Sequence, residues 1–174
     1  MTSSAIQDEY PDDVSHCYGC GRLNTQGLHI RSFWDGSEAT ATFTPAPHHT
    51  AIPGYVYGGL LASLVDCHAT GTAAAAARQA RGGSAQAAPP PRFVTASLQV
   101  DYLLPTPLGP PLQLRARPAE IAGRKIVVEV ELSAGERVCV RGRVVTVEMP
   151  EHLVRPASTT DGESALPPDG TVRQ

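Results

Sequence analysis

The fold is decided by the stretch GYVYGGLLASLVD, residues 54–66, in which a pair of glycines opens a helical pattern. Apolar residues then recur at the spacing of a helix rather than of a strand, at Leu60, Leu61, Leu64 and Val65. An alanine-rich continuation carries this pattern to about residue 80, and alanine is the strongest helix former. We therefore expect one long helix over residues 58 to about 80.

An acid falls inside this helix, on a face of small residues. At about 100° per residue, the small-residue face holds Gly59, Ala62, Ser63, Asp66, Thr70 and Ala73. The opposite, apolar face holds Leu60, Leu61, Leu64 and His68. A ligand has room to lie against the Asp66 carboxylate, and the two glycines let it approach unpaired N–H groups at the helix start. One helix thus offers a carbonyl-polarising end and, two turns on, a base. The alternative is that Asp66 is solvated or pairs with a neighbouring chain.

The composition of the chain excludes several classes of protein. The chain has 174 residues, of which 41% are hydrophobic and 18% charged, as expected for one globular domain. A net charge of −3 and an aromatic content of 5% do not suit a nucleic-acid binder. The N-terminus lacks the layout of a signal peptide, and Asp66 and His68 lie in the middle of the helical stretch, which argues against a membrane span. We expect a cytoplasmic protein with no nucleic-acid or membrane partner.

The rest of the chain predicts an α+β domain over residues 15–150, with disordered segments at 1–14 and 151–174. A hairpin is expected over Leu28–Phe43, then a loop over Pro45–Pro53 that holds His48 and His49. After an irregular connection, period-2 alternation predicts four strands, Phe93–Leu104, Leu112–Ile121, Lys125–Leu132 and Arg137–Val147. We expect an antiparallel meander of five to six strands that curls around the helix, because a helix with apolar residues on most sides needs cover on most sides.

The four cysteines, Cys17, Cys20, Cys67 and Cys139, do not form a disulfide framework in a chain of this size. The segment CYGC, residues 17–20, has the spacing of half a zinc site or of a redox pair. No second Cys-x-x-Cys or His-x-x-x-His motif completes four ligands. We therefore favour a tight glycine turn with two partly buried thiols, and expect no metal.

Three motifs in order carry a family resemblance: the Cys-x-x-Cys-Gly turn, Gly-x-x-Tyr-Gly-Gly with an acid eight residues after the first paired glycine, and VTASLQVDYLLP at residues 94–105. Together they resemble the hotdog-fold thioesterases, and within these the PaaI-like acyl-CoA thioesterases. The resemblance covers about residues 16–148. It implies a hotdog fold, a long central helix wrapped by a curled antiparallel sheet. It also implies homodimers joined edge to edge, in some members dimers of dimers, with active sites at the dimer interface.

The resemblance further implies hydrolysis of an acyl thioester, with acyl-CoA as the expected substrate and no cofactor. The backbone N–H of Gly58 would polarise the thioester carbonyl, and Asp66 of the partner chain would be the base or nucleophile. Thr95 matches a position that helps to hold the attacking water. The expected substrate contacts are Tyr57, Gly59, Ser63, Thr70, His49, Arg124 and Lys125. Cations expected to receive the phosphates of coenzyme A are Arg78, Arg81, Arg92, Arg124 and Lys125.

The chain departs from the family at two positions before the helix. Tyr57 stands where many members have histidine, and Ala51 where some have an amide. Tyr57 either hydrogen-bonds the substrate or covers the helix start, and His48 or His49 is a candidate replacement for the lost polar group. His68 faces about 200° away from Asp66 along the helix and is expected to pack. Two alternative functions stay open: a non-catalytic acyl-CoA-binding protein, and a hydratase of enoyl or hydroxyacyl thioesters, which needs a converging Asp and His.

Overall fold

The computed structural model describes residues 4–83 and 89–150. The disorder expected for residues 1–3 and 151–174, and part of the connection before residue 93, fall outside these ranges. Within them, no helix combines the length and the apolar character that crossing a membrane requires.

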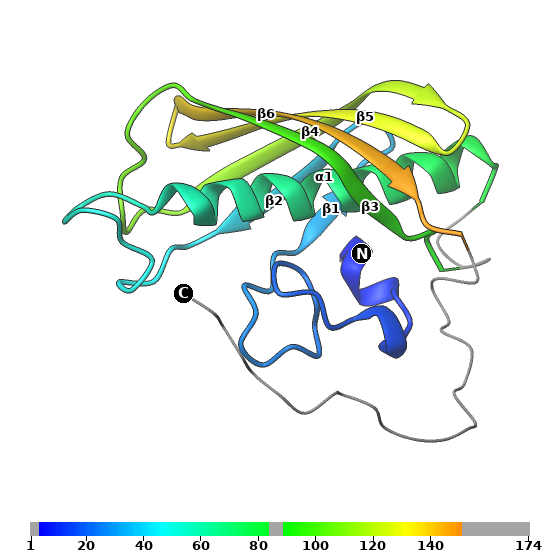
Figure 1. Ribbon diagram of the computed structural model, residues 1–174, viewed down its shortest axis with the longest axis horizontal. Helices are drawn as coiled ribbons and strands as arrows, with labels where there is room; N and C mark the ends of the chain where they lie inside the picture. The colour runs from blue at the N-terminus through cyan, green and yellow to red at the C-terminus, as the bar shows by residue number, and fades with distance from the viewer. Residues whose placement is uncertain (1–3, 84–88, 151–174) are drawn as a thin grey trace, which may run out of the picture.

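One long helix lies against a single sheet (Figure 1). The helix, α1, spans Gly58–Ala80, so the predicted helix is confirmed. Two 3-10 helices, η1 and η2, precede the strands. The elements run η1 Ile6–Glu9, η2 Asp12–Val14, β1 Ser32–Trp34, β2 Ala39–Phe43, α1, β3 Phe93–Tyr102, β4 Leu112–Ala122, β5 Lys125–Ala134 and β6 Arg137–Glu148. The α+β prediction, with its antiparallel sheet of five to six strands, is therefore confirmed.

The six strands follow the order β1-β2-β4-β5-β6-β3, and every neighbouring pair is antiparallel. Two-residue loops with Gly123 and Gly135 at positive φ join β4 to β5 and β5 to β6 as hairpins. The simple meander is wrong for β3, which pairs with β6 instead of β4. The longer connection after β3 permits this crossing, and a hydrogen bond from Val56 N–H to the Thr106 carbonyl (2.9 Å) ties it to the loop before α1. Strand β3 thus forms one edge of the sheet.

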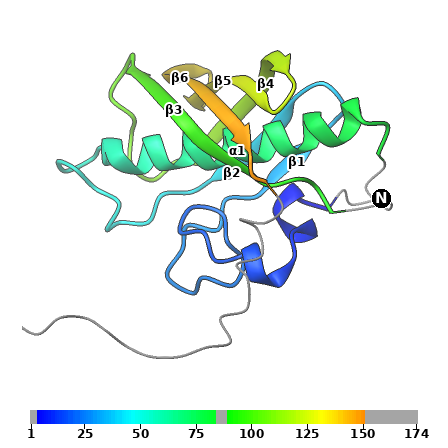
Figure 2. The same cartoon turned by 45° about the vertical axis from the view of Figure 1, so that its right-hand side comes forward.

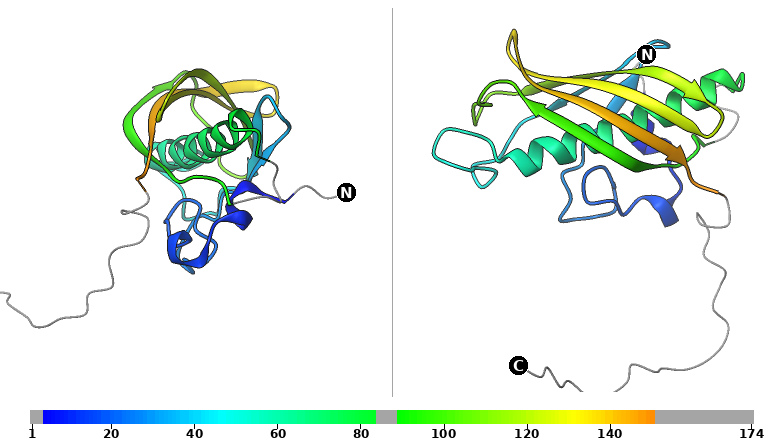
Figure 3. Two further views of the ribbon diagram at one scale, coloured as in Figure 1. Left: turned by 90° about the vertical axis from the view of Figure 1, so that its right-hand side faces the viewer. Right: turned by 45° about the horizontal axis from the view of Figure 1, so that its top comes forward.

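The sheet curves slightly over one side of α1 (Figure 3). Its inner face alternates as predicted, with apolar residues of β4, β5 and β6 packed on the helix and charged residues pointing outward. On the helix, Leu60, Leu61, Leu64 and Val65 are buried in this core. The small-residue face of α1 is half-buried as far as Thr70, whereas Ala73 is fully buried.

The N-terminal segment corrects one expectation. Residues 4–14 were expected to be disordered, but they form η1 and η2 on the side of α1 that faces away from the sheet (Figure 2). Ile6 and Tyr10 are buried there. The side chain of Gln7 exchanges hydrogen bonds with Ser32, donating to its Oγ (3.1 Å) and accepting from its N–H (2.8 Å). The physical reason is that the sheet covers only one side of α1, which also has buried residues on other sides, so the N-terminal segment supplies further cover.

Candidate functional site

Two residues predicted from separate motifs meet in the structure. Thr95 Oγ1 on the edge strand β3 donates a hydrogen bond to Oδ1 of Asp66 on the small-residue face of α1. The register of β3 against β6 shifts between Thr95 and Ser97, and such a bulge re-aims the side chains beside it. The Asp66 carboxylate is half-buried, so a small molecule can still reach it.

Burial raises the pKa of Asp66 above its ordinary value, because a charged carboxylate loses hydration there. The hydrogen bond from Thr95 acts in the opposite direction, and negative charge on Cys17 adds to the increase in pKa. A carboxylate with a raised pKa is a stronger base than an ordinary one. The environment of Asp66 therefore suits proton abstraction.

The helix start forms a second part of the site. Gly58 and Gly59 occupy the first turn of α1, where backbone N–H groups have no acceptor within the helix. The Tyr57 ring lies against Gly59, so close that a Cβ on Gly59 would be 2.4 Å from the ring. Tyr57 therefore lies over the helix start, with its side chain largely exposed, and its role towards a substrate stays a prediction.

Tyr102 was not predicted as a site residue. Its hydroxyl, at the end of β3, donates to the Gly58 carbonyl at 2.9 Å. Its ring also lies beside Gly58, where a Cβ would be 3.4 Å from the nearest ring atom. The available signal was an aromatic residue within the 94–105 motif, seven positions after Thr95.

The other predicted contacts on the helix and its preceding loop are engaged within the chain. Ser63 donates to the Gly59 carbonyl (2.9 Å) and Thr70 to the Cys67 carbonyl (3.1 Å), so these hydroxyls offer a ligand only acceptor capacity. The His49 ring accepts the N–H of Ala46 through Nδ1 (3.0 Å). Its carbonyl accepts the N–H of Tyr57 (2.9 Å), so His49 holds the loop against the helix start.

His68 packs, as expected, on the far side of the helix from Thr95. It is fully buried, with Nε2 at 3.2 Å from the Ala39 carbonyl and Nδ1 at 2.8 Å from Ser32 Oγ. Because a carbonyl can only accept, Nε2 is assigned the proton and Nδ1 accepts from the serine. Burial lowers the pKa of His68 to about 4, so the ring is neutral.

The cations expected to receive phosphates all have partners in the chain. Arg78 pairs with Glu9 and Arg81 with Glu148, Lys125 lies 3.0 Å from Glu120, Arg124 donates to the Glu148 carbonyl at 2.6 Å, and Arg92 stacks on Tyr10. Arg81 and Arg124 meet at Glu148, beyond the C-terminal end of α1. Arg81 is fifteen residues after Asp66, about 22 Å along the helix axis.

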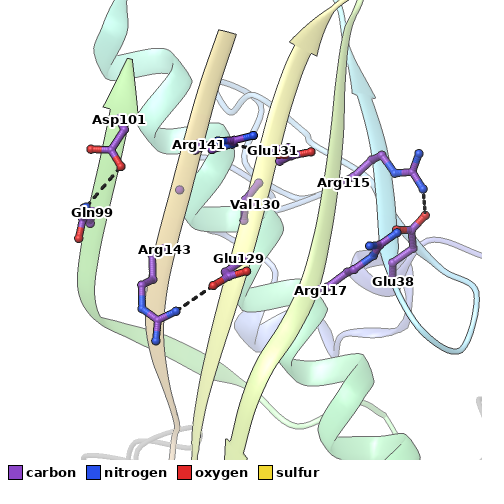
Figure 4. Close-up of a pocket in the computed structure, with 11 residues that line it drawn as sticks. Glu38, Gln99, Asp101, Arg115, Arg117, Glu129, Val130, Glu131, Arg141 and Arg143 are labelled. Atoms are coloured by element: carbon purple, nitrogen blue, oxygen red, sulfur yellow. Dashed lines mark hydrogen bonds and ion pairs between the residues drawn. The ribbon is translucent and has the colours of Figure 1, made fainter. Parts of the chain in front are cut away.

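A hollow on the outer face of the sheet is a different kind of surface (Figure 4). Its walls are ion pairs between neighbouring strands, Arg143 with Glu129 (3.0 Å), Arg141 with Glu131 (3.1 Å) and Glu38 with two arginines. The hollow lies on the opposite side of the sheet from α1 and includes neither Asp66 nor Thr95. Its charged walls do not suit an acyl chain, so the candidate site remains at Asp66.

Comparisons with known proteins bear on the family and the fold of the chain. The sequence profile of the thioesterase superfamily matches residues 53–141. A solved thioesterase superfamily protein from Shewanella loihica PV-4 is 48% identical with a TM-score of 0.62, and the match covers 81% of this chain and all of that one. A thioesterase from Haemophilus influenzae, 14% identical with a TM-score of 0.60 over 75% of this chain and 85% of its own, shares the fold. The acyl-coenzyme A thioesterase THEM4 of Xenopus laevis is 31% identical over 90 residues, 52% of this chain but 35% of that relative. The matched part therefore spans about a third of the THEM4 relative.

Proposed function

The chain belongs to the thioesterase superfamily, and from this premise we propose that it hydrolyses acyl-CoA thioesters with Asp66 as the base or nucleophile. The observation that carries the proposal is the hydrogen bond between Thr95 and Asp66. It joins the only acid on the small-residue face of α1 to a hydroxyl on the edge strand. A carboxylate and a hydroxyl so placed can together hold a water molecule beside them, and the carboxylate can take its proton.

The reaction needs little beyond this carboxylate. Asp66 removes a proton from water while the water oxygen attacks the thioester carbon, or attacks that carbon itself to give an anhydride that water then opens. The carbonyl oxygen becomes an oxyanion, which the orphan N–H groups of Gly58 and Gly59 stabilise at the positive end of the helix dipole. As the oxyanion collapses, the carbon–sulfur bond breaks, and in the anhydride route this happens before water enters. The proton that Asp66 takes from water passes to the thiolate sulfur, so the products are a free acid and the thiol of coenzyme A. A thiolate is a stable leaving group, since an ordinary thiol has a pKa of about 8.5.

Helix geometry supports a site shared between two copies of the chain. Asp66 follows Gly58 by eight residues, which is about 12 Å along the helix axis. A reacting carbonyl must lie about 3 Å from both its base and its oxyanion donors. One helix cannot meet both requirements, so we propose that Gly58 of one chain and Asp66 of the other serve the same thioester.

The sheet offers a surface for this pairing. Strand β3 has one neighbour, β6, and residues 94–99 of β3 are exposed. An unpaired edge of this length is a template for another strand. Joining two copies antiparallel about the middle of β3 would bring the Thr95 end of one strand, beside Asp66, to the Tyr102 end of the other, beside Gly58. The result is a homodimer that is able to assemble further into a dimer of dimers.

Acyl-CoA is proposed as the substrate because the THEM4 relative is named for it. Arg124 and Lys125 are proposed phosphate contacts. Lys125 supports this role because its side chain is about half exposed, and an exposed ion pair is weak enough to exchange for a phosphate. A hydratase is less well supported, since Asp66 hydrogen-bonds a threonine and the nearby His68 is buried against β1 and β2.

The test is turnover of a panel of acyl-CoA thioesters, and of matched thioesters without the nucleotide, with detection of the free thiol. Asp66→Asn keeps the shape of the side chain and removes the base, so we expect kcat to fall by about 10²- to 10⁴-fold. Asp101→Asn is the matched control, because Asp101 is an exposed acid on β3 whose side chain contacts Gln99 instead. Parent-like turnover by Asp66→Asn would contradict the assignment. Tight acyl-CoA binding without turnover by the parent would favour the non-catalytic alternative.

A further inference from the structure

Three of the four cysteines gather at one point, although only two are close in sequence. The sulfur atoms of Cys17, Cys20 and Cys67 all lie within 4.8 Å of one another, and the Cys17 and Cys67 sulfurs are 3.7 Å apart. Cys17 and Cys20 come from the glycine turn before β1, whereas Cys67 belongs to α1 and directly follows Asp66. The sequence showed half a metal site, and the third thiol was hidden in a helix fifty residues away.

We propose that Cys17, Cys20 and Cys67 bind one zinc ion as thiolates, with a water molecule as the fourth ligand. A tetrahedral zinc ion with Zn–S bonds of about 2.3 Å places two sulfurs about 3.8 Å apart, close to the separation of Cys17 and Cys67. Cys20 and Cys67 are buried and Cys17 is half-buried, so solvent reaches the cluster on the side of Cys17.

The local backbone is shaped for this arrangement. Gly19 lies so close to the helix that a Cβ there would come within 2.2 Å of the Cys67 sulfur. Gly21 is equally confined, since a Cβ would lie 2.4 Å from the Cys17 nitrogen, and its N–H closes the turn on the Cys17 carbonyl at 2.8 Å. The two glycines therefore let the turn bring both of its thiols to the third.

A cation beside the cluster suits a site made of thiolates. Each thiol loses its proton when the metal ion binds, because the thiolate is the metal ligand. Three thiolates and a divalent zinc ion leave one net negative charge. The Arg92 guanidinium, stacked 4.2 Å from the centroid of the Tyr10 ring, lies close enough to Cys20 to act on it through its charge and would balance the remainder.

The experiment is metal analysis of the reduced, full-length protein after chelation and reloading with zinc, followed by titration with a chromophoric chelator. We expect one zinc per chain, and an affinity at least about tenfold lower in Cys17→Ser and in Cys67→Ser, since each removes a ligand. Cys17→Ser changes a half-buried side chain and so keeps the test valid if Cys67→Ser does not fold. Cys139→Ser is the matched control, because Cys139 is buried on β6 and its sulfur contacts the Arg137 carbonyl.

Cobalt substitution gives an independent readout. We expect a thiolate-to-cobalt charge-transfer band in the parent and in Cys139→Ser, and a weaker band in Cys17→Ser, which keeps two of the three thiolates. Less than half an equivalent of zinc in the reduced parent, or equal affinity in the parent and Cys17→Ser, would overturn the proposal, as would a Cys17–Cys67 disulfide that persists in excess reductant. Metal content is measured without turnover, so failure here leaves the hydrolysis test untouched.

Discussion

Gly142→Ala is predicted to destabilise the domain through a single methyl group. Gly142 lies in the middle of β6, between Val100 of β3 and Val130 of β5, where a strand ordinarily prefers a larger side chain. A Cβ at this position would meet Cγ1 of Val65 on α1 at 2.3 Å. Carbon atoms pack best at about 3.5 to 4.0 Å, so the helix or the strand would have to move by more than 1 Å.

Val65 cannot easily rotate away from the added methyl group. A valine in a helix strongly prefers one χ1 rotamer, and Val65 is fully buried. Overpacking of this kind costs about 1 to 3 kcal/mol, and we expect the upper half of that range. The backbone of Gly142 is not in the left-handed region. The loss of stability in Gly142→Ala therefore measures the contact between the new Cβ and Val65, and not backbone strain.

The assay is urea denaturation of the parent, Gly142→Ala, Val65→Ala and the double variant. Val65→Ala removes the methyl group that the new Cβ would strike, so the double variant should be at least about 1 kcal/mol more stable than additivity predicts. Additive effects, or a Gly142→Ala protein as stable as the parent, would contradict a steric clash between residue 142 and Val65. The second outcome would mean that the lower backbone entropy of the unfolded alanine chain outweighs the contact.

Two further predictions concern the site and the outer face of the sheet. Thr95→Val keeps the shape of the side chain but removes the hydrogen bond to Asp66. A hydrogen bond to a charged group contributes about 1.5 to 3 kcal/mol, so we expect kcat to fall about 10- to 100-fold with KM little changed, and activity to be retained in Thr95→Ser. An unchanged kcat in Thr95→Val would contradict the role of Thr95. Hydrogen bonds from Arg115 and Arg117 hold the pKa of Glu38 below its ordinary value of 4.5, so its contribution to the free energy of unfolding is present above pH 4.5 and is lost as the pH falls through the lower, folded pKa. Glu38→Gln should therefore lose less stability on acidification than the parent in urea titrations, and parallel pH profiles would count against this account.

The helix and the strands could be predicted because their residues follow strong local patterns. The small-residue face of α1 singled out Asp66, and the motif on β3 singled out Thr95. The position of β3 at the edge of the sheet, beside β6, could not be predicted in this way. It depends on a crossing connection and not on the alternation of residues within a strand. The order of residues 4–14 was missed because their composition is mostly polar. The segment is held by a few apolar side chains, of which Ile6 and Tyr10 are buried. Likewise, no local spacing brings Cys67 to Cys17, since a helix and a loop meet there only in three dimensions.

The position of the Asp66 carboxylate depends on its two neighbours in the chain. Val65, on one side, packs against β6 where Gly142 leaves no Cβ, and Cys67, on the other, packs against the cysteine turn where Gly19 leaves none. In both places a methyl group would lie less than 2.5 Å from a side-chain atom of the helix. The helix is thus held at close contact by two glycines that are 123 residues apart in sequence. Asp66, which lies between these contacts, keeps its approach to Thr95 because the helix has little freedom to rotate or shift.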